Sequence, residues 1–297
     1  MLFSVVIPTY NRAAYLRQTL ESVFAQTFTD YEVVAVDDGS TDETVQVLRS
    51  YGQQVRFFRQ ENAGPGVARN LGMTQARGDY VAFLDSDDIW FPWTLAVFAD
   101  LILAHNSPTI LAGHLVEFRE VTELSAVWEK RLRAEVFADY FAASRSGYFV
   151  GAGMSVLRRE ELLKTGGYTE QPINAEDHDL ILRLGTAAGF IQVLEPPTLG
   201  WRRHFAAATA DDRRSFEGIR YLVEQERRGA YPGGDVRARQ RREIITRHAR
   251  PTSLACLWHG FRKEAWQLYC NTFRWHLHLT RWKYLLGFPL RAFLPRR

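Results

Sequence analysis

Three carboxylates crowd into four residues at Asp85-Ser86-Asp87-Asp88, directly after an apolar run typical of a strand. Placing like charges so close together is unfavourable unless solvent or a cation neutralises them. A hard cation such as Mg²⁺ or Mn²⁺ takes oxygen ligands and usually joins one or two carboxylates to the phosphates of a substrate. The segment therefore predicts a divalent-metal site or, alternatively, a solvated turn with a helix cap.

The elements that must position this acidic segment lie in the first hundred residues. Short β-branched runs alternate there with helical patterns, which predicts a doubly wound, mostly parallel α/β sheet. We expect strands at 3–7, 31–36, 55–58 and 80–84, helices at 14–25 and 67–76, and another helix capped by Ser40 or Thr41. Because the carboxyl ends of such strands line one edge, one rim should carry the acidic segment, Asp37-Asp38 and Pro8-Thr9-Tyr10-Asn11.

Further along the chain, residue spacing predicts strands at 110–118 and 151–157, helices at 134–143 and 177–189, and a mostly helical region after about 215. The balance of charged residues also changes along the chain. Residues 1–200 hold 16 Lys and Arg against 26 Asp and Glu, whereas residues 201–297 hold 21 against 8. A basic segment of this kind attracts anions such as phosphates or lipid headgroups.

Four blocks of the sequence resemble the opening of family 2 glycosyltransferases and occur in that family's order over about residues 1–95. They are SVVIPTYNR at 4–12, VDDGSTD at 36–42, ENAGPGVARN at 61–70 and AFLDSDD at 82–88. Glu176-Asp177 and Arg202-Arg203-His204 extend the resemblance, more loosely, to about residue 205.

The resemblance implies a GT-A fold, a Rossmann-like α/β architecture, here with a helical C-terminal extension. It implies a hexosyl- or related transferase that moves a sugar from a nucleoside-diphosphate sugar to an acceptor hydroxyl. The acceptor class would be a saccharide or lipid-linked saccharide, in cell-surface polysaccharide or glycolipid assembly. We expect a catalytic domain at 1–212, with donor binding in 1–105 and the acceptor side in 106–212, followed by a basic, Trp-rich extension at 213–297.

Carried over residue by residue, the resemblance places Pro8, Thr9 and Tyr10 beside the nucleotide base. Asp38 would accept a hydrogen bond from a ring N–H of that base, because a carboxylate is an acceptor only; the alternative is a turn or cap residue. Arg69, near the start of a helix, would favour the diphosphate, or else be a surface arginine.

The same resemblance makes Asp85 and Asp87 the pair that binds Mn²⁺ or Mg²⁺ at the diphosphate, with Asp87 as the direct ligand of first choice. Asp88 would instead cap the following segment. From the late Arg-x-His segment, His204 would reach the metal and Arg202 a phosphate. A cation there would stabilise the departing nucleoside diphosphate.

Asp177 matches the family's catalytic base, which takes the proton from the acceptor hydroxyl in a single, inverting displacement. The alternative is an N-terminal helix carboxylate stabilised by the helix dipole. A second reading of the whole chain is a sugar-nucleotide-binding protein that has lost catalysis, against which the intact Asp85, Asp87 and Asp177 argue.

The basic tail mixes aromatic and basic residues, which suits either docking on a domain or an interfacial hold on an anionic membrane. No charged n-region precedes the first strand, and the apolar region 89–105 is broken by Pro92 and Asp100. Cys256 and Cys270 match no zinc or disulfide pattern. We therefore expect a cytoplasmic protein, peripheral on the inner face of the membrane. The acidic front and the lack of a nucleic-acid-binding motif argue against a nucleic-acid partner.

Overall fold

The computed structural model describes residues 1–203 and 211–293, which fall into two compact units. The first unit is built from Met1–Tyr140, Tyr148–Gln171 and 187–203. The second is built from Phe141–Gly147, Pro172–Thr186 and 211–293.

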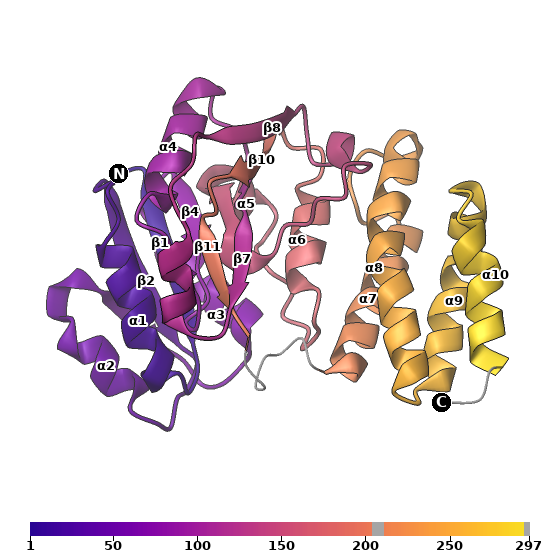
Figure 1. The fold of residues 1–297 in the computed structure, drawn as a ribbon, viewed down its shortest axis with the longest axis horizontal. Helices are drawn as coiled ribbons and strands as arrows, with labels where there is room; N and C mark the ends of the chain where they lie inside the picture. Colours follow the sequence, from indigo (N-terminus) through magenta and orange to yellow (C-terminus); the bar gives the residue numbers. More distant parts are fainter. Residues whose placement is uncertain (204–210, 294–297) are drawn as a thin grey trace. The chain divides into compact units, whose positions relative to one another are not determined.

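An eight-stranded mixed sheet forms the centre of the first unit (Figure 1). Its strand order is β3 (Arg56–Arg59), β2 (Tyr31–Asp37), β1 (Phe3–Thr9), β4 (Tyr80–Phe83), β9 (Ser155–Arg158), β6 (Ile110–Ala112), β10 (Phe190–Glu195) and β8 (Arg133–Phe137). The first four strands are parallel to one another. The carboxyl ends of β1, β2 and β4 therefore share one edge, and the predicted α/β architecture is confirmed.

Helices α1 (Ala13–Phe24), α2 (Thr44–Ser50), α3 (Pro65–Gln75), α4 (Thr94–Ala104) and α5 (Arg159–Lys164) accompany this sheet. All seven residues of β1 are buried, as an apolar strand covered on both faces requires. Gly72 lets α3 lie close to β1, because a Cβ there would come within 2.4 Å of Cγ1 of Val6. The sheet and α3 thus fix the edge on which the polar loops stand.

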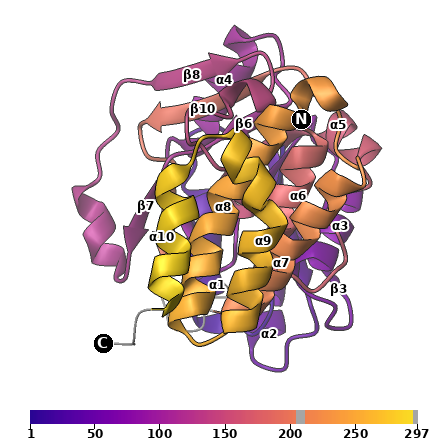
Figure 2. The ribbon, with the colours of Figure 1, turned by 90° about the vertical axis from the view of Figure 1, so that its right-hand side faces the viewer.

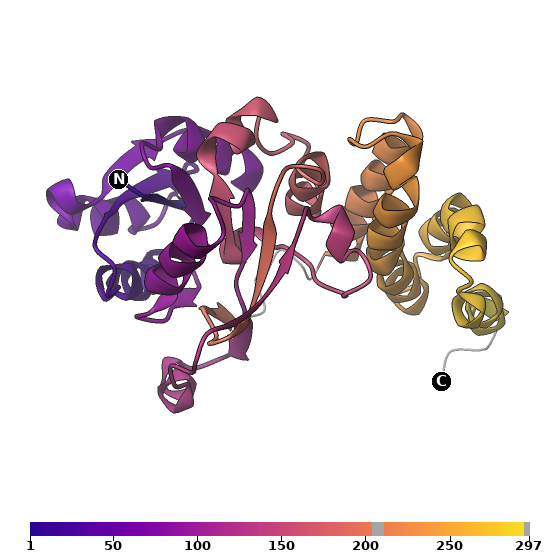
Figure 3. The ribbon, with the colours of Figure 1, turned by 90° about the horizontal axis from the view of Figure 1, so that it is seen from above.

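A second, three-stranded sheet lies in the same unit, with β11 (Leu199–Arg202) between β5 (Ile89–Trp90) and β7 (Leu115–Phe118). Figure 3 shows β7 and β11 running together, in parallel register from Leu199 and Leu115 onward. Because β11 also pairs with β5, the residues at its end come beside the segment that follows β4. This small sheet therefore places the end of β11 next to the segment before β5, although more than a hundred residues separate them in the sequence.

Two predicted elements differ in type or number in the structure, and two more are shorter than predicted. Of the shorter two, the helix predicted at 177–189 ends at Arg183, and the strand predicted at 151–157 begins at Ser155. The helix predicted at 134–143 is wrong: β8 occupies its first half and pairs antiparallel with β10, where Phe137 stacks on Phe190 at 5.7 Å. A 3₁₀ turn, Phe141–Ala143, follows. Sheet pairing overrides the helix preference of the alanines. The strand predicted at 110–118 is two strands, because β6 pairs in the large sheet and β7 in the small one. Gly113 lies between them, and a Cβ there would come within 2.2 Å of Oγ1 of Thr198.

The second unit is helical, as predicted for the C-terminal region (Figure 2). Its helices are α6 (Glu176–Arg183), α7 (Asp212–Arg227), α8 (Ala238–Trp258), α9 (Arg262–His278) and α10 (Trp282–Phe293). Asp211 caps α7 by accepting from the amides of the second and third residues. A buried ion pair of 2.6 Å between Glu226 and Arg241 joins α7 to α8. None of the helices in the described ranges is long and apolar enough to cross a membrane.

Candidate active site

Asn11 interlocks the loops that follow β1 and β2. Its amide donates to Oγ of Ser40 at 2.9 Å, and its Oδ1 accepts from the amide of Thr41 at 2.8 Å. Asp42 accepts from the amides of Ala13 and Thr44. Although burial acts in the opposite direction, the hydrogen bonds from Thr44 and Ala13 lower the pKa of Asp42. Neither Ser40 nor Thr41 caps α2, so that prediction is wrong; Ser40 instead ties the two loops together.

Asp38, at the end of β2, anchors the loop that leads into α3. It is buried, and its carboxylate accepts from Nε2 of Gln60 at 2.8 Å and from the amides of Ala63 and Gly64, both at 2.9 Å. A carboxylate offers about four acceptor positions, so these three bonds leave one position. The structure shows Asp38 holding this loop in place. Its contact with a nucleotide base stays a prediction.

Arg69 is directed from α3 into the acidic segment. It is 5% exposed, and its Nη2 lies 2.7 Å from Oδ1 of Asp85. The guanidinium also lies over the ring of Tyr168. The side-chain amide of Asn70 holds Tyr168 in place, because it donates to the backbone carbonyl of Tyr168 and accepts from its backbone N–H. A surface role for Arg69 is therefore ruled out by its burial, and its charge faces the rim.

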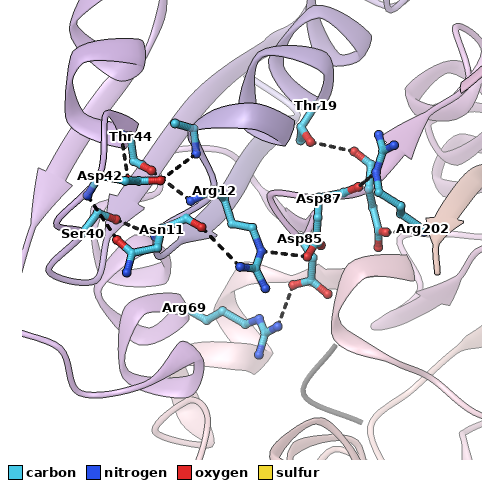
Figure 4. A network of polar contacts seen from close by, with 12 residues as sticks. Asn11, Arg12, Thr19, Ser40, Asp42, Thr44, Arg69, Asp85, Asp87 and Arg202 are labelled. Atoms are coloured by element: carbon cyan, nitrogen blue, oxygen red, sulfur yellow. Dashed lines mark hydrogen bonds and ion pairs between the residues drawn. The ribbon is translucent and has the colours of Figure 1, made fainter. Parts of the chain in front are cut away.

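Two further arginines hold the acidic segment (Figure 4). Nε of Arg12, from the loop after β1, lies 3.1 Å from Oδ2 of Asp87. Arg202, from β11, donates its backbone amide to Oδ1 of Asp88 at 2.9 Å and its Nε to the carbonyl of Asp87 at 2.7 Å. The carboxylates of Asp85 and Asp87 thus each pair with a guanidinium group, whereas the carboxylate of Asp88 is held by a backbone amide.

Arg202 fixes the shape of this turn. Its guanidinium lies between the rings of Tyr15 and Phe118, and its Nη2 donates to Gln18 at 2.7 Å. The phosphate contact expected of Arg202 stays a prediction. Asp88 does not cap the following segment, because its carboxylate accepts from the distant amide of Arg202; that prediction is wrong.

The carboxylates differ in their exposure and charge. Asp88 is 2% exposed, and burial, with the nearby charges of Asp85 and Asp87, raises its pKa well above the ordinary value. The side chains of Asp85 and Asp87 are 34% and 20% exposed. A ligand can therefore reach Asp85 and Asp87, whereas Asp88 belongs to the interior.

Gly153 lies against these carboxylates, since a Cβ there would come within 3.1 Å of Oδ2 of Asp85 and 3.5 Å of Oδ2 of Asp88. The missing side chain leaves room beside Asp85. No group of three or more His, Cys, Asp or Glu residues that could hold a metal occurs in residues 1–203 and 211–293. Two accessible carboxylates fit a hard cation shared with a phosphate ligand better than a closed protein cage. His204 lies outside the described residues.

The base-binding residues predicted at the end of β1 share the same edge. Pro8 and Thr9 are buried within β1, and the hydroxyl of Thr9 has no hydrogen-bond partner in the part of the chain that the structure describes. Tyr10 is 44% exposed. Its ring is therefore accessible to a planar base, whereas Pro8 and Thr9 are enclosed within the sheet.

Asp177 lies in the second unit, in the first turn of α6. The loop before α6 is fixed on α7, where a Cβ at Gly218 would come within 2.0 Å of the carbonyl of Asn174. Asp177 is 25% exposed, whereas Asp179 is buried and bonded to Arg183 at 2.9 Å and to the hydroxyl of Tyr231 at 3.0 Å. Asp179 is thus committed to structure, and Asp177 is the accessible aspartate of this turn.

The sequence analysis gave no role to Arg12 and placed Gly153 only within a predicted strand at 151–157. The sequence did contain a signal for Arg12. Arg12 follows the polar cluster at the end of β1, and β1 lies beside β4, which leads into the three carboxylates. The arrangement of parallel strand ends on one edge would have placed it opposite Asp87. The nearness of Gly153 to Asp85 depends on a distant pairing, β4 with β9, and left no local signal.

Comparison with known proteins decides the family. A sequence profile described as Glycosyl transferase family 2 matches residues 4–165, more than half of the chain. The chain belongs to this family. The family 2 resemblance of the four sequence blocks is therefore confirmed.

Among family relatives, poly(ribitol-phosphate) beta-N-acetylglucosaminyltransferase TarS of Staphylococcus aureus (strain Mu50) is 40% identical over 117 residues, covering 37% of this chain and 20% of TarS. Matches to other curated relatives also span a small part of them, from 14% to 36% of their length.

Solved structures show the same fold. The crystal structure of S. aureus TarS 1-349 in complex with UDP-GlcNAc has a TM-score of 0.75 at 23% identity and covers 92% of this chain and 79% of that one. Mannosyltransferase PcManGT from Pyrobaculum calidifontis, in complex with GDP-Man and Mn²⁺, has a TM-score of 0.55 at 18% identity over 99% of this chain and 88% of that one. These likenesses confirm the GT-A fold predicted from the sequence.

Proposed function

We propose that this family 2 member is an inverting glycosyltransferase that moves a sugar from a nucleoside-diphosphate sugar to an acceptor hydroxyl with the help of Mn²⁺ or Mg²⁺. The observation that carries the proposal is the accessible pair Asp85 and Asp87, faced by Arg69 and Arg12 on the rim where β1, β2 and β4 end. Alternating carboxylates and guanidinium groups suit a bound cation and a diphosphate together.

The side chains of the rim have separate roles in this proposal. Asp85 and Asp87 would hold the cation, and Arg69 would bind the diphosphate after exchanging its contact with Asp85. Tyr10 would cover the base, with Asp38 as an additional acceptor. His204, which the late Arg-x-His segment supplies, is a further proposed ligand. The cation would offset the charge on the departing diphosphate.

Asp177 is proposed as the general base. Its carboxylate is accessible in the first turn of α6, where the neighbouring Asp179 is used for packing. A base in this role removes the proton from the acceptor hydroxyl as that oxygen attacks the anomeric carbon. A single attack of this kind inverts the anomeric centre, and no second carboxylic acid is needed because the leaving group is a phosphate.

The names of similar proteins suggest the first ligands to test. TarS is named for transfer of N-acetylglucosamine to poly(ribitol phosphate) and was crystallised with UDP-GlcNAc, and PcManGT with GDP-Man and Mn²⁺. We propose a saccharide or lipid-linked saccharide acceptor in cell-surface polysaccharide or glycolipid assembly. UDP- and GDP-sugars are accordingly the donors of first choice.

A thermal-shift screen of nucleoside diphosphates and their sugars, with and without Mn²⁺, tests the proposal. A ligand at 100 times its dissociation constant adds about 2.7 kcal/mol to stability, which raises the melting temperature by several degrees. We expect one base family to give this shift only when Mn²⁺ is present, and Asp87→Ala to abolish it. Asp79→Asn, at an exposed position just before β4, is the matched control.

Two outcomes separate the alternatives. Metal-dependent binding without any donor hydrolysis or transfer, over long incubation with candidate acceptors, would favour a sugar-nucleotide-binding protein without catalysis. If neither Mn²⁺ nor Mg²⁺ changes the binding of any nucleotide sugar, the proposed use of Asp85 and Asp87 is wrong.

A further inference from the structure

Helix α10 has two apolar faces, of which its own unit covers one. Tyr284, Leu285 and Phe288 are buried, with Phe288 stacked on Tyr269 of α9 at 4.6 Å and the Tyr284 hydroxyl 2.7 Å from Oγ of Ser253 on α8. The second face is the α10 stripe, which consists of Trp282 at 53% exposure, Leu286 at 66%, Leu290 at 68% and Phe293 at 79%. A helix docked through one face alone would place polar residues on the other.

The four side chains of the α10 stripe line up along the helix. Their positions follow the spacing i, i+4, i+8 and i+11, which at 3.6 residues per turn keeps them within about a quarter of the circumference. Figure 2 shows α10 beside α9 in the second unit. The stripe is therefore a continuous and largely exposed apolar surface, at the end of which the Phe293 ring also packs edge-on against Trp266 of α9 at 6.3 Å.

The charges on α10 itself have one sign. Its charged residues are Lys283 and Arg291, and both are exposed. From residue 265 to residue 297 the sequence contains six Lys and Arg and no Asp or Glu. A helix that exposes large apolar side chains and carries only basic charges complements an interface of acyl chains below anionic headgroups.

We propose that the α10 stripe docks onto the surface of an anionic lipid bilayer, with its apolar side chains inserted among the acyl chains and Lys283 and Arg291 at the headgroups. This surface is narrower than the aromatic tail that the sequence singled out. Trp275, Tyr284, Leu285 and Phe288 are buried in the unit and take no part. The inference stands apart from the proposed transfer reaction, because it uses none of the residues at the rim.

A second copy of the chain fits the stripe less well. A two-fold contact would place the same patch on both sides, so the basic residues of one stripe would face those of the other. A 12-residue helix is about 18 Å long, and one of its faces is much smaller than the roughly 800 Å² per partner of a stable protein interface. A bilayer requires no such area because charge attraction adds to insertion.

Vesicle co-flotation of the full chain tests the proposal. We expect the protein to float with vesicles of phosphatidylcholine mixed with phosphatidylglycerol, whose headgroup is anionic, and not with phosphatidylcholine alone. Leu286→Gln combined with Leu290→Gln should raise the lipid concentration at half-binding by about tenfold or more. Lys283→Gln combined with Arg291→Gln should raise it by about fivefold for each charge lost.

Matched controls use exposed residues on other elements. Leu103→Gln on α4 and Val236→Gln, at positions 81% and 89% exposed, should float as the unaltered chain does. Arg119→Gln with Arg239→Gln removes the same charge from exposed positions elsewhere and should have a smaller effect than the α10 pair. Unchanged melting temperatures would show that every variant folds.

Any of three results would overturn the proposal. The first is flotation of the Leu286 and Leu290 variant equal to that of the unaltered chain. The second is no flotation of the unaltered chain with anionic vesicles. The third is a dimer, seen by sedimentation equilibrium without lipid, that the same double substitution dissolves; the stripe would then be a contact between copies.

Discussion

The guanidinium of Arg12 lies 3.1 Å from the carboxylate of Asp87, although 75 residues separate them in the sequence. Parallel pairing of β1 with β4 creates this relationship, because it sets the loops that follow the two strands side by side. In the proposed enzyme, Arg12 and a divalent cation would compete for the same oxygen atoms. The pair therefore gives a direct way to test the role of Asp87.

Arg12→Gln should lower the Mn²⁺ concentration required for half-maximal stabilisation by the donor nucleotide. The pair is partly exposed, and such pairs contribute about 0.2–1 kcal/mol, so we expect a shift of roughly twofold to fivefold. Calorimetric titration with Mn²⁺ in the presence of nucleotide measures it. A higher Mn²⁺ requirement in the variant would show that Arg12 supports the cation site instead of competing with it.

Asp177→Asn should retain donor binding and lose transfer, by about 10²–10⁴-fold in turnover, because an amide cannot take the acceptor proton. Thermal shift with donor and Mn²⁺ checks binding, and product formation at saturating donor checks turnover. Normal turnover in this variant would assign the base to another residue.

Asp179→Asn, two residues further along the chain, should lower the stability of the protein and leave its turnover nearly unchanged. The side chain of Asp179 is 3% exposed and pairs with Arg183, so its neutralisation should cost about 1–3 kcal/mol. Denaturant unfolding measures that loss. Turnover of the protein that remains folded should be close to normal, and a large loss of turnover without destabilisation would contradict the assignment.

Gly153→Ala should disturb the proposed metal-binding oxygens without unfolding the chain. The added Cβ would lie 3.1 Å from Oδ2 of Asp85, and this partly exposed carboxylate can yield by a few tenths of an ångström. Because misplacement of about 1 Å at a reacting centre costs as much as about 10²-fold, we expect turnover to fall about tenfold. Gly287→Ala, where nothing lies within 4 Å of the new atom, should leave turnover unchanged.

Acidification should destabilise the helical unit through His276. Burial, with the charges of Arg281 and Arg250, lowers the pKa of His276 to about 3, whereas the unfolded value is about 6.5. The unfolded chain therefore takes up a proton first, so this contribution is intact above about pH 6.5 and is lost as pH falls below it.

By pH 5.5 the loss from His276 should be about 1.4 kcal/mol. His276→Leu should flatten the dependence of the melting temperature on pH between 7.5 and 5.5, while His105→Gln, at an exposed position, should not. An identical pH dependence in the unaltered chain and in His276→Leu would show that His276 is not the source.

Much of the fold follows from local pattern. The continuous apolar runs that became β1, β2 and β4 needed burial on both faces, and the alternating helical segments supplied the cover. Strand direction then placed the polar clusters at Asn11, Asp38 and Asp85 on one edge. Local preference failed at Ala134, where a run with helical character became β8, because β10 offered unpaired backbone and Phe190 a stacking partner.

The sequence by itself determined the family, the α/β architecture and the carboxylates at the end of β4, since each depends on residues close together in the chain. Only the tertiary structure decided how those carboxylates are used. It separated the buried Asp88 from the accessible Asp85 and Asp87, placed Arg12 on Asp87, and divided the aromatic tail into a packed face and an exposed one. These distinctions depend on burial and on partners 75 to 115 residues away, which no local pattern encodes.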